Sequence, residues 1–381
     1  MLPNARGLQR RELYDALQPH LGRGLEQRHL EGFVDRLYVD LFKHHAMSVD
    51  DVENLRPLSR LRRGIVENAL EVESLLKLER SILSEYDGSR RMVFQIRRRE
   101  KTSVKIEAVA IPRRDDVTLC LSSQSGCALA CSFCATGLLG FQENLTTAEI
   151  LEQHAWAERQ MGKRVTDIVF MGMGEPLLNY DAVIAAAHRL TETDCAQISF
   201  KRIVLSTAGV VPQIHRYARE QQPFALYFSI TSAIPEKRRE LMPIENSYPL
   251  DELVKAIRAY LESRRWNPRA TLEYVAIPDV NMDDEDVEAI GKVFGSLPII
   301  LNVIPYNATD GRYRPPNWTE VKRFTTKLRR LDIAVKIRFS GAKTERGGCG
   351  QLAADLIEGV PLSGHHLAPP GIFSDLARSS Q

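Results

Sequence analysis

The chain has 381 residues, of which 44% are hydrophobic, 26% charged and 7% aromatic. This apolar content excludes a disordered or collagen-like chain, and the length accommodates one large core with an accessory domain. The formal net charge is only +2, so a nucleic-acid-binding surface would have to be a local patch.

The sequence indicates neither a membrane span nor a secretory leader. No run of apolar residues reaches the roughly 18 that a spanning helix needs. The first residues, MLPNARGLQRREL, lack the apolar segment of a signal peptide. We therefore expect a cytoplasmic protein that has no membrane partner.

Residues 1–90 are predicted to form a small helical accessory domain. Apolar residues recur there at three- and four-residue spacing, with charged residues between them, in the segments 7–21, 25–45 and 58–83. The region holds no cysteine and no obvious catalytic cluster. It is therefore expected to support the chemistry of another region and not to carry it.

Near Arg91 the apolar period changes from helical to alternating, which predicts a basic β-hairpin linker over residues 91–112. Its strands are expected at 91–99 and 102–112. The hairpin and its margin carry seven basic residues: Arg90, Arg91, Arg97, Arg98, Arg99, Lys101 and Lys105. Such a ribbon is typical of a surface that binds phosphates, and equally of a sheet edge protected by charge.

Residues 113–345 are predicted to form an α/β core in which short apolar strands alternate with amphipathic helices. Strands are expected at 117–122, 165–171, 202–207, 224–230, 271–277 and 299–305, with a late addition at 335–340. Helices are expected at 147–160, 181–192, 249–265 and 319–331. Thr146 with Glu149 fits a capping box, and Pro249 suits a first helical turn. Repeated βα units indicate a mainly parallel sheet, open or closed into a barrel, with the active site at the carboxyl ends of its strands.

Four of the six cysteines fall within fifteen residues, which points to metal or redox chemistry. The six are Cys120, Cys127, Cys131, Cys134, Cys195 and Cys349. Three of them follow the first core strand with the spacing C-x3-C-x2-C, and such a loop suits three irons of a [4Fe–4S] cluster whose fourth iron stays open. Zinc is the alternative, but no second cysteine pair or spaced histidine pair completes a zinc site. We expect one [4Fe–4S] cluster on Cys127, Cys131 and Cys134.

The remaining metal-ligating residue types give no further signal. The nine histidines show no metal-ligand spacing, and the adjacent pair His44 and His45 would point in different directions on either a helix or a strand. Cys195 is interpreted as structural.

The cysteine loop, which has an aromatic residue before its last cysteine, resembles the radical S-adenosylmethionine (SAM) superfamily. Within it, the chain is similar to the RNA methyltransferases of the RlmN/Cfr family. The similarity is carried by LCLSSQSGCALACSFCATGLLGFQENLTTAEI, GMGEPLLNY, LSTAGVVP and CGQL, in the family's order. It extends over about residues 100–355, with a fainter match over 7–70. The resemblance implies a partial (βα)6 radical SAM barrel, SAM as a cofactor beside the cluster, and RNA binding by residues 1–90.

The resemblance also implies a reaction that uses two SAM molecules per turnover. One gives its methyl group to a cysteine near the C-terminus, matched here by Cys349 in the segment 346–381. The other is cleaved to a 5′-deoxyadenosyl radical, which takes a hydrogen atom from the methylated cysteine, and the resulting carbon radical adds to adenine. Cys120 matches the cysteine that resolves this adduct through a transient disulfide, and Glu107 matches the proton acceptor. By spacing alone, Glu107 would be an exposed strand carboxylate and Cys120 a buried strand residue.

Seven positions match SAM contacts of the family: Gly174, Glu175, Ser206, Ser229, Ile230, Thr231 and Asn307. A carboxylate at Glu175 suits the ammonium group of SAM. Each position also has an ordinary structural interpretation, because Gly174 and Asn307 suit turns and Ser206 suits a strand interior.

Two segments depart from the family pattern. Ser229-Ile230-Thr231 stands where the family usually has Ser-Leu-His, and residues 343–348 are more basic and glycine-rich than usual. We expect methylation of carbon 2 of an adenosine in 23S rRNA, with tRNA as a second substrate. Carbon-8 methylation, a radical SAM reaction on a non-RNA substrate, and a non-catalytic RNA-binding module stay open as alternatives. The family implies a reductase partner, flavodoxin or ferredoxin.

Overall fold

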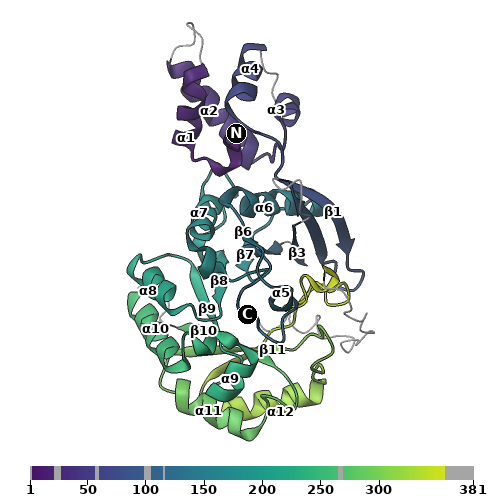
Figure 1. The fold of residues 1–381 in the computed structure, drawn as a ribbon, viewed down its shortest axis with the longest axis vertical. Coiled ribbons are helices and arrows are strands. Elements are labelled where there is room, and N and C mark those ends of the chain that lie inside the picture. The colour runs from purple at the N-terminus through teal and green to yellow at the C-terminus, as the bar shows by residue number, and fades with distance from the viewer. Residues whose placement is uncertain are drawn as a thin grey trace.

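The computed structural model describes residues 2–20, 27–55, 60–97, 104–114, 116–264 and 269–356. The first helices gather at one end of the molecule, and the helices that follow the later strands lie at the other (Figure 1). Within the described ranges, no helix has both the length and the apolar character needed to cross a membrane.

Four helices form the N-terminal unit: α1 (Arg10–Leu17), α2 (Gln27–Phe42), α3 (Val49–Leu55) and α4 (Arg60–Ala69). A reciprocal capping box between Gln9 and Glu12 begins α1. Leu37 and Leu41, one helical turn apart on α2, are fully buried. The helical pattern of the N-terminal sequence is therefore observed as far as Ala69.

The helical prediction is wrong for residues 76–83, which form the strand β1 (Leu76–Leu83). This strand pairs antiparallel with β2 (Arg90–Ile96), with Leu76 opposite Ile96. The segment LKLERSIL is too short and too weakly periodic for its pattern alone to separate helix from strand. The backbone donors and acceptors along the edge of β2 decide the outcome, because a strand can pair with them and a helix cannot. A helical domain over residues 1–90 is thus corrected to a helical unit that ends at Ala69.

One ten-stranded sheet continues from β1 in the order β1-β2-β3-β4-β7-β8-β9-β10-β11-β12. Its other members are β3 (Lys105–Arg113), β4 (Asp116–Cys120), β7 (Asp167–Phe170), β8 (Ile203–Thr207), β9 (Ala225–Ser229), β10 (Ala270–Ala276), β11 (Ile299–Pro305) and β12 (Ala334–Ile337). Strands β1 to β4 are antiparallel neighbours, and β4 to β12 are parallel ones. All seven predicted core strands are present. Within the described residues the sheet stays open between β1 and β12, as expected of a partial barrel.

The predicted basic hairpin is part of this sheet and not a separate linker. Its strands β2 and β3 pair as expected, but β3 also pairs with β4, with Val109 opposite Cys120. Arg91 is only 1% exposed, so it does not belong to a solvent-facing basic ribbon. Arg98, Arg99 and Lys101 lie outside the described residues.

The connecting helices cover the sheet and leave the carboxyl ends of the parallel strands together at one edge. They are α6 (Thr147–Met161), α7 (Tyr180–Thr191), α8 (Val211–Arg219), α9 (Pro235–Leu241), α10 (Leu250–Ser263), α11 (Asp284–Phe294) and α12 (Trp318–Leu328). The predicted capping box of Thr146 and Glu149 begins α6, and Pro249 is the N-cap residue of α10. The helices α8, α9 and α11 were not predicted.

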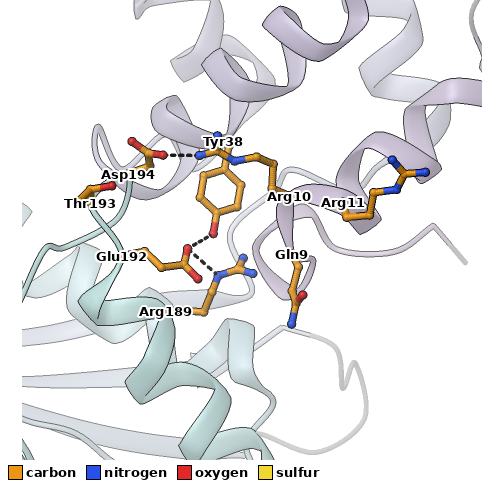
Figure 2. Close-up of a pocket in the computed structure, with 8 residues that line it drawn as sticks. All are labelled: Gln9, Arg10, Arg11, Tyr38, Arg189, Glu192, Thr193 and Asp194. Carbon is orange, nitrogen blue, oxygen red and sulfur yellow. Dashed lines mark hydrogen bonds and ion pairs between the residues drawn. The ribbon is translucent and has the colours of Figure 1, made fainter. Parts of the chain in front are cut away.

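Charged and aromatic side chains join the N-terminal unit to the barrel (Figure 2). Arg10 of α1 forms an ion pair with Asp194, in the loop after α7. The guanidinium group of Arg189, on α7, lies 5.0 Å from the ring centre of Tyr38 and 4.7 Å from that of Phe42, both on α2. These contacts orient the helical unit over α6 and α7.

Candidate active site at the carboxyl ends of the parallel strands

The three-cysteine loop begins just beyond β4, after the short strand β5 (Gln124–Ser125), and leads into α5 (Ala135–Leu139). Gly126 allows it to turn tightly. Its φ is +71°, and a Cβ there would lie 1.7 Å from the carbonyl oxygen of Gly140. Because β4 ends at the carboxyl edge of the sheet, this turn places the three cysteines at that edge.

Cys127, Cys131 and Cys134 form one electrostatic group. Burial, followed by the charges of the neighbouring thiols, raises the pKa of Cys131 well above its ordinary value. Burial likewise raises the pKa of Cys127 to about 12. Buried thiols become thiolates when a cation binds them, so this loop is suited to a metal centre.

The chemistry of these side chains fits an iron–sulfur cluster. All three are free, half-buried thiols from one loop. Thiolates are the usual protein ligands of such clusters, and three of them leave one iron of a [4Fe–4S] cluster open. A structural zinc ion would need a fourth protein ligand. The residues therefore fit the cluster that the sequence predicts.

Glu175, beyond the end of β7, is a buried carboxylate that accepts hydrogen bonds from two backbone N–H groups and from the hydroxyl of Thr207. It is 3% exposed, and its two oxygens accept the N–H groups of Leu177 at 3.0 Å and Ala208 at 2.8 Å. Burial raises its pKa to about 7 in spite of these bonds, and among the described residues no cation pairs with it. The preceding Gly174 has a φ of +98°, and a Cβ there would lie 2.5 Å from Cβ of Gln124. This arrangement suits the ammonium group of a ligand.

Ser206, next to last in β8, and Ser229, the last residue of β9, have their Oγ atoms 3.3 Å apart. Ser206 donates a hydrogen bond of 2.7 Å to one carboxylate oxygen of Glu273 on β10. Arg338, which follows β12, donates one of 2.7 Å to the other oxygen. The structure thus adds Glu273 and Arg338 to the predicted set. A charged residue inside the apolar strand TLEYVAI was the signal that could have identified Glu273.

Ile230 and Thr231 carry the chain out of β9, and both are fully buried. The side chain of Ile230 belongs to the apolar core. Thr231 has a φ of +52°, and its Oγ1 is buried with no hydrogen-bond partner among the described residues. An unsatisfied buried hydroxyl costs about 1–3 kcal/mol, so this oxygen is suited to a ligand.

The loop that carries Cys349 is held by side chains at the ends of β11 and β12. The backbone N–H of Cys349 donates to Ser340 Oγ at 3.1 Å, and the carbonyl oxygen of Cys349 accepts from Asn307 Nδ2 at 3.0 Å. The N–H of Ala135, the first residue of α5, donates to the carbonyl of Gly350. Asn307 therefore supports the Cys349 loop, a role that the sequence did not indicate, and the loop lies against the helix that follows the cysteine cluster.

Cys120 and Cys349, far apart in the sequence, are brought together at this edge. Burial raises the pKa of Cys120 to about 12, and the nearby thiol of Cys349 contributes to the rise. Cys349 acts in the same way on Cys134. Burial also lowers the pKa of Lys343, and the nearby Cys349 acts in the opposite direction by raising that pKa. Two cysteines outside the cluster loop thus share one neighbourhood with it.

Glu107 on β3 is fully buried and not exposed as its strand position suggested. Its two oxygens accept from Arg91 Nε at 2.9 Å and Nη2 at 2.6 Å. The third nitrogen of Arg91 donates to Asp355 and to the carbonyl of Glu345, both in the segment that flanks Cys349. Arg91 therefore links the predicted base to the loop of the predicted methyl acceptor. The sequence prediction missed it because cross-strand pairing decides which arginine faces inward.

Comparisons with known proteins identify the family of this fold. Residues 121–290 match the Radical SAM superfamily. A probable RNA methyltransferase of Myxococcus xanthus is 41% identical over 338 residues, 88% of this chain and 92% of the relative. A dual-specificity RNA methyltransferase RlmN of Syntrophobacter fumaroxidans is 38% identical over 320 residues, 83% of this chain and 91% of the relative. The crystal structure of a radical SAM methyltransferase from Sphaerobacter thermophilus aligns with a TM-score of 0.83 at 30% identity, over 92% of this chain and 99% of that one.

Proposed function

The chain belongs to the radical SAM RNA methyltransferase family, and we propose that it methylates an adenine carbon of RNA through a methylated Cys349. The observation that carries the proposal is that Cys120 and Cys349, two cysteines outside the cluster loop, meet beside it. A radical SAM reaction without a methylcysteine has no use for this pair.

The family uses a [4Fe–4S] cluster and SAM, and the residues to hold them are present. Cys127, Cys131 and Cys134 are assigned to the cluster. A cluster bound there supplies the electron that cleaves SAM into methionine and a 5′-deoxyadenosyl radical. For SAM we propose the carboxylate of Glu175 as the partner of the ammonium group, with the Ser206–Ser229 pair as further contacts.

Cys349 is the methyl carrier in this proposal. Its sulfur attacks the methyl group of a first SAM, S-adenosylhomocysteine leaves, and the thiol proton is released. This methyl group loses a hydrogen atom to the 5′-deoxyadenosyl radical, which becomes 5′-deoxyadenosine. The carbon radical that remains on Cys349 then bonds to adenine and leaves one unpaired electron on the base. The hydrogen bonds from Asn307 and to Ser340 hold the backbone of Cys349 in place for these steps.

Cys120 and Glu107 complete the reaction. Glu107 accepts the proton of the adenine carbon, which requires it to give up one hydrogen bond from Arg91. The unpaired electron that radical addition leaves on the base would return to the oxidised cluster. The Cys120 thiolate attacks the sulfur of Cys349, a disulfide forms, and the carbon–sulfur bond breaks. The electron pair of that bond and a proton turn the methylene group into methyl. An external dithiol must then reduce the disulfide. Two SAM molecules are used per turnover, because one supplies the methyl group and the other supplies the radical.

For the target we propose carbon 2 of an adenosine in 23S rRNA, with tRNA as a second substrate. The support is similarity to relatives whose names describe dual-specificity RNA methyltransferases. Carbon 8 is the alternative. The basic loop before Cys349 and the free hydroxyl of Thr231 are the places where this chain differs from the family pattern. A flavodoxin or ferredoxin is the proposed electron donor.

The test is to express Cys120→Ala together with iron–sulfur assembly proteins and to purify it without oxygen. Without the resolving thiol, we expect RNA to remain joined to Cys349 through a methylene bridge. Sequencing that RNA names the target, and mass spectrometry of the nucleoside separates carbon 2 from carbon 8. The double variant Cys120→Ala/Cys349→Ala is the matched control and should carry no RNA. A Cys120→Ala protein with an intact cluster, no RNA and no methyl group on Cys349 would contradict the proposal.

A further inference from the structure

Outside the active site, three metal-ligating side chains meet where the N-terminal unit rests on the barrel. His154 and Glu158 lie one turn apart on α6, so both point to the same side of that helix. His45, in the turn after α2, faces them from the N-terminal unit, and its Nε2 lies 2.7 Å from Glu158 Oε2. The histidines are far apart in the sequence, which is why the sequence indicated no metal spacing. Figure 1 shows α6 directly beside the N-terminal helices.

The distances are close to those of a first coordination shell. Ligand atoms on one tetrahedral zinc ion lie roughly 3.3 Å apart, because zinc binds imidazole nitrogen and carboxylate oxygen at ~2.0–2.2 Å. Here His154 Nε2 lies 3.5 Å from Glu158 Oε1, and all three ligating atoms lie within 4.8 Å of one another. Displacements of the ligating atoms by about one ångström, through side-chain rotation, would bring all three within bonding distance of one zinc ion.

An unpaired buried nitrogen is the second, independent observation. His154 is 2% exposed, and its Nε2 is buried with no hydrogen-bond partner among the described residues. A buried ring nitrogen without a hydrogen-bond partner is a position that a metal ion can occupy.

The surroundings of these three side chains hold Glu158 in place and leave a route from solvent to the site. The backbone N–H of Val165 donates to Glu158 Oε1 at 2.7 Å, which fixes the orientation of the carboxylate as supporting hydrogen bonds do at metal sites. A cavity of about 570 Å³ reaches His45 and Glu158 from the surface. Its wall also carries Lys43, Arg159, Lys163 and Arg164. These cations weaken binding of a bare divalent ion and favour an anionic fourth ligand from solvent, such as hydroxide.

We propose that His45, His154 and Glu158 bind one divalent metal ion such as zinc, which links the N-terminal unit to α6. Two imidazoles and one carboxylate with an open fourth position form a donor set that zinc accepts. The site does not depend on the proposed methyl transfer, so either conclusion can fail without the other.

The experiment loads the purified, cluster-containing protein with zinc alone, removes the excess by gel filtration and measures zinc and iron per chain. We expect about one zinc per chain in the parent and no retained zinc in His154→Ala. The matched control is His44→Ala, which removes the exposed neighbouring histidine and should retain zinc. The iron content reports whether each variant still holds its cluster. If His154→Ala does not fold, Glu158→Gln takes its place.

X-ray absorption at the zinc edge separates this site from zinc on the cysteine loop. The proposal predicts nitrogen and oxygen neighbours at ~2.0–2.2 Å, whereas zinc on cysteine shows sulfur at ~2.3 Å. Zinc should also raise the melting temperature of the parent and not that of His154→Ala, since a ligand that binds the folded state stabilises it. Absence of retained zinc, sulfur neighbours, or equal zinc in the parent and His154→Ala would each overturn the proposal.

Discussion

Two buried glutamates at the carboxyl edge of the sheet differ in one respect, the presence of a cation. On the antiparallel side, Glu107 receives two hydrogen bonds from Arg91, and both residues are sealed from solvent. On the parallel side, Glu175 receives hydrogen bonds from two backbone N–H groups and the Thr207 hydroxyl, and burial raises its pKa to about 7. Arg91 balances the charge of the first carboxylate, whereas no cation among the described residues pairs with the second. A buried charge without a partner is thus the better indicator of a binding position.

The largest effect is expected from breaking the balanced pair. Arg91→Met leaves Glu107 as an uncompensated buried charge, which should lower the free energy of unfolding by about 3–5 kcal/mol. Chemical denaturation measures this loss. The double variant Arg91→Met/Glu107→Gln should recover much of it, because the buried charge is then gone. A double variant as unstable as Arg91→Met would show that Arg91 acts mainly through Asp355 and Glu345.

The carboxylate of Glu175, which has no cation beside it among the described residues, should affect the binding of SAM more than the stability of the fold. Glu175→Gln keeps the shape of the side chain but removes the charge, and a charge-assisted hydrogen bond contributes about 1.5–3 kcal/mol. We expect the Kd for SAM of cluster-loaded protein, measured by equilibrium dialysis, to rise roughly 10- to 100-fold. The control Glu262→Gln changes an exposed carboxylate on α10 and should leave this Kd unchanged. An unchanged Kd in Glu175→Gln would contradict the ammonium contact.

The same group predicts a pH dependence. The pKa of Glu175 is raised from 4.5 to about 7 in the folded protein, so its protonated form favours folding below pH 4.5, and this contribution is lost as pH rises through 7. SAM reverses the preference, because its ammonium group binds the carboxylate. Affinity for SAM should therefore fall about tenfold per pH unit below 7, and Glu175→Gln should lack this slope. A flat profile in the parent would contradict the raised pKa.

The smallest effect is expected at the loop of the methyl acceptor. Asn307→Ala removes the hydrogen bonds to Ser340 Oγ and to the carbonyl of Cys349, which should cost about 1–2 kcal/mol locally. Hydrogen exchange of residues 347–352 should accelerate while the core strands keep their protection. Asn68→Ala, which removes an exposed amide, is the control. Unchanged exchange in Asn307→Ala would show that the loop is held mainly by its contacts with α5.

Local patterns were sufficient where neighbouring residues decide the structure. The spacing of Cys127, Cys131 and Cys134 is contained in one loop, and the capping box of Thr146 and Glu149 is contained in one helical turn, so both were predictable. The segment 76–83 was mispredicted because its state depends on the pairing edge of β2. Glu107 was expected to be exposed for a similar reason, since nothing within β3 shows that Arg91 faces it.

By itself, the sequence determined the seven core strands, the cysteine loop and the resemblance that names the chemistry, because these depend on residues close together in the chain. Only the tertiary structure decided which distant groups meet. It placed Cys120 beside Cys349, paired Glu107 with Arg91, left Glu175 without a cation, and brought His45 to His154. The physical reason is that burial and charge pairing depend on the packing of distant segments, which no local period encodes.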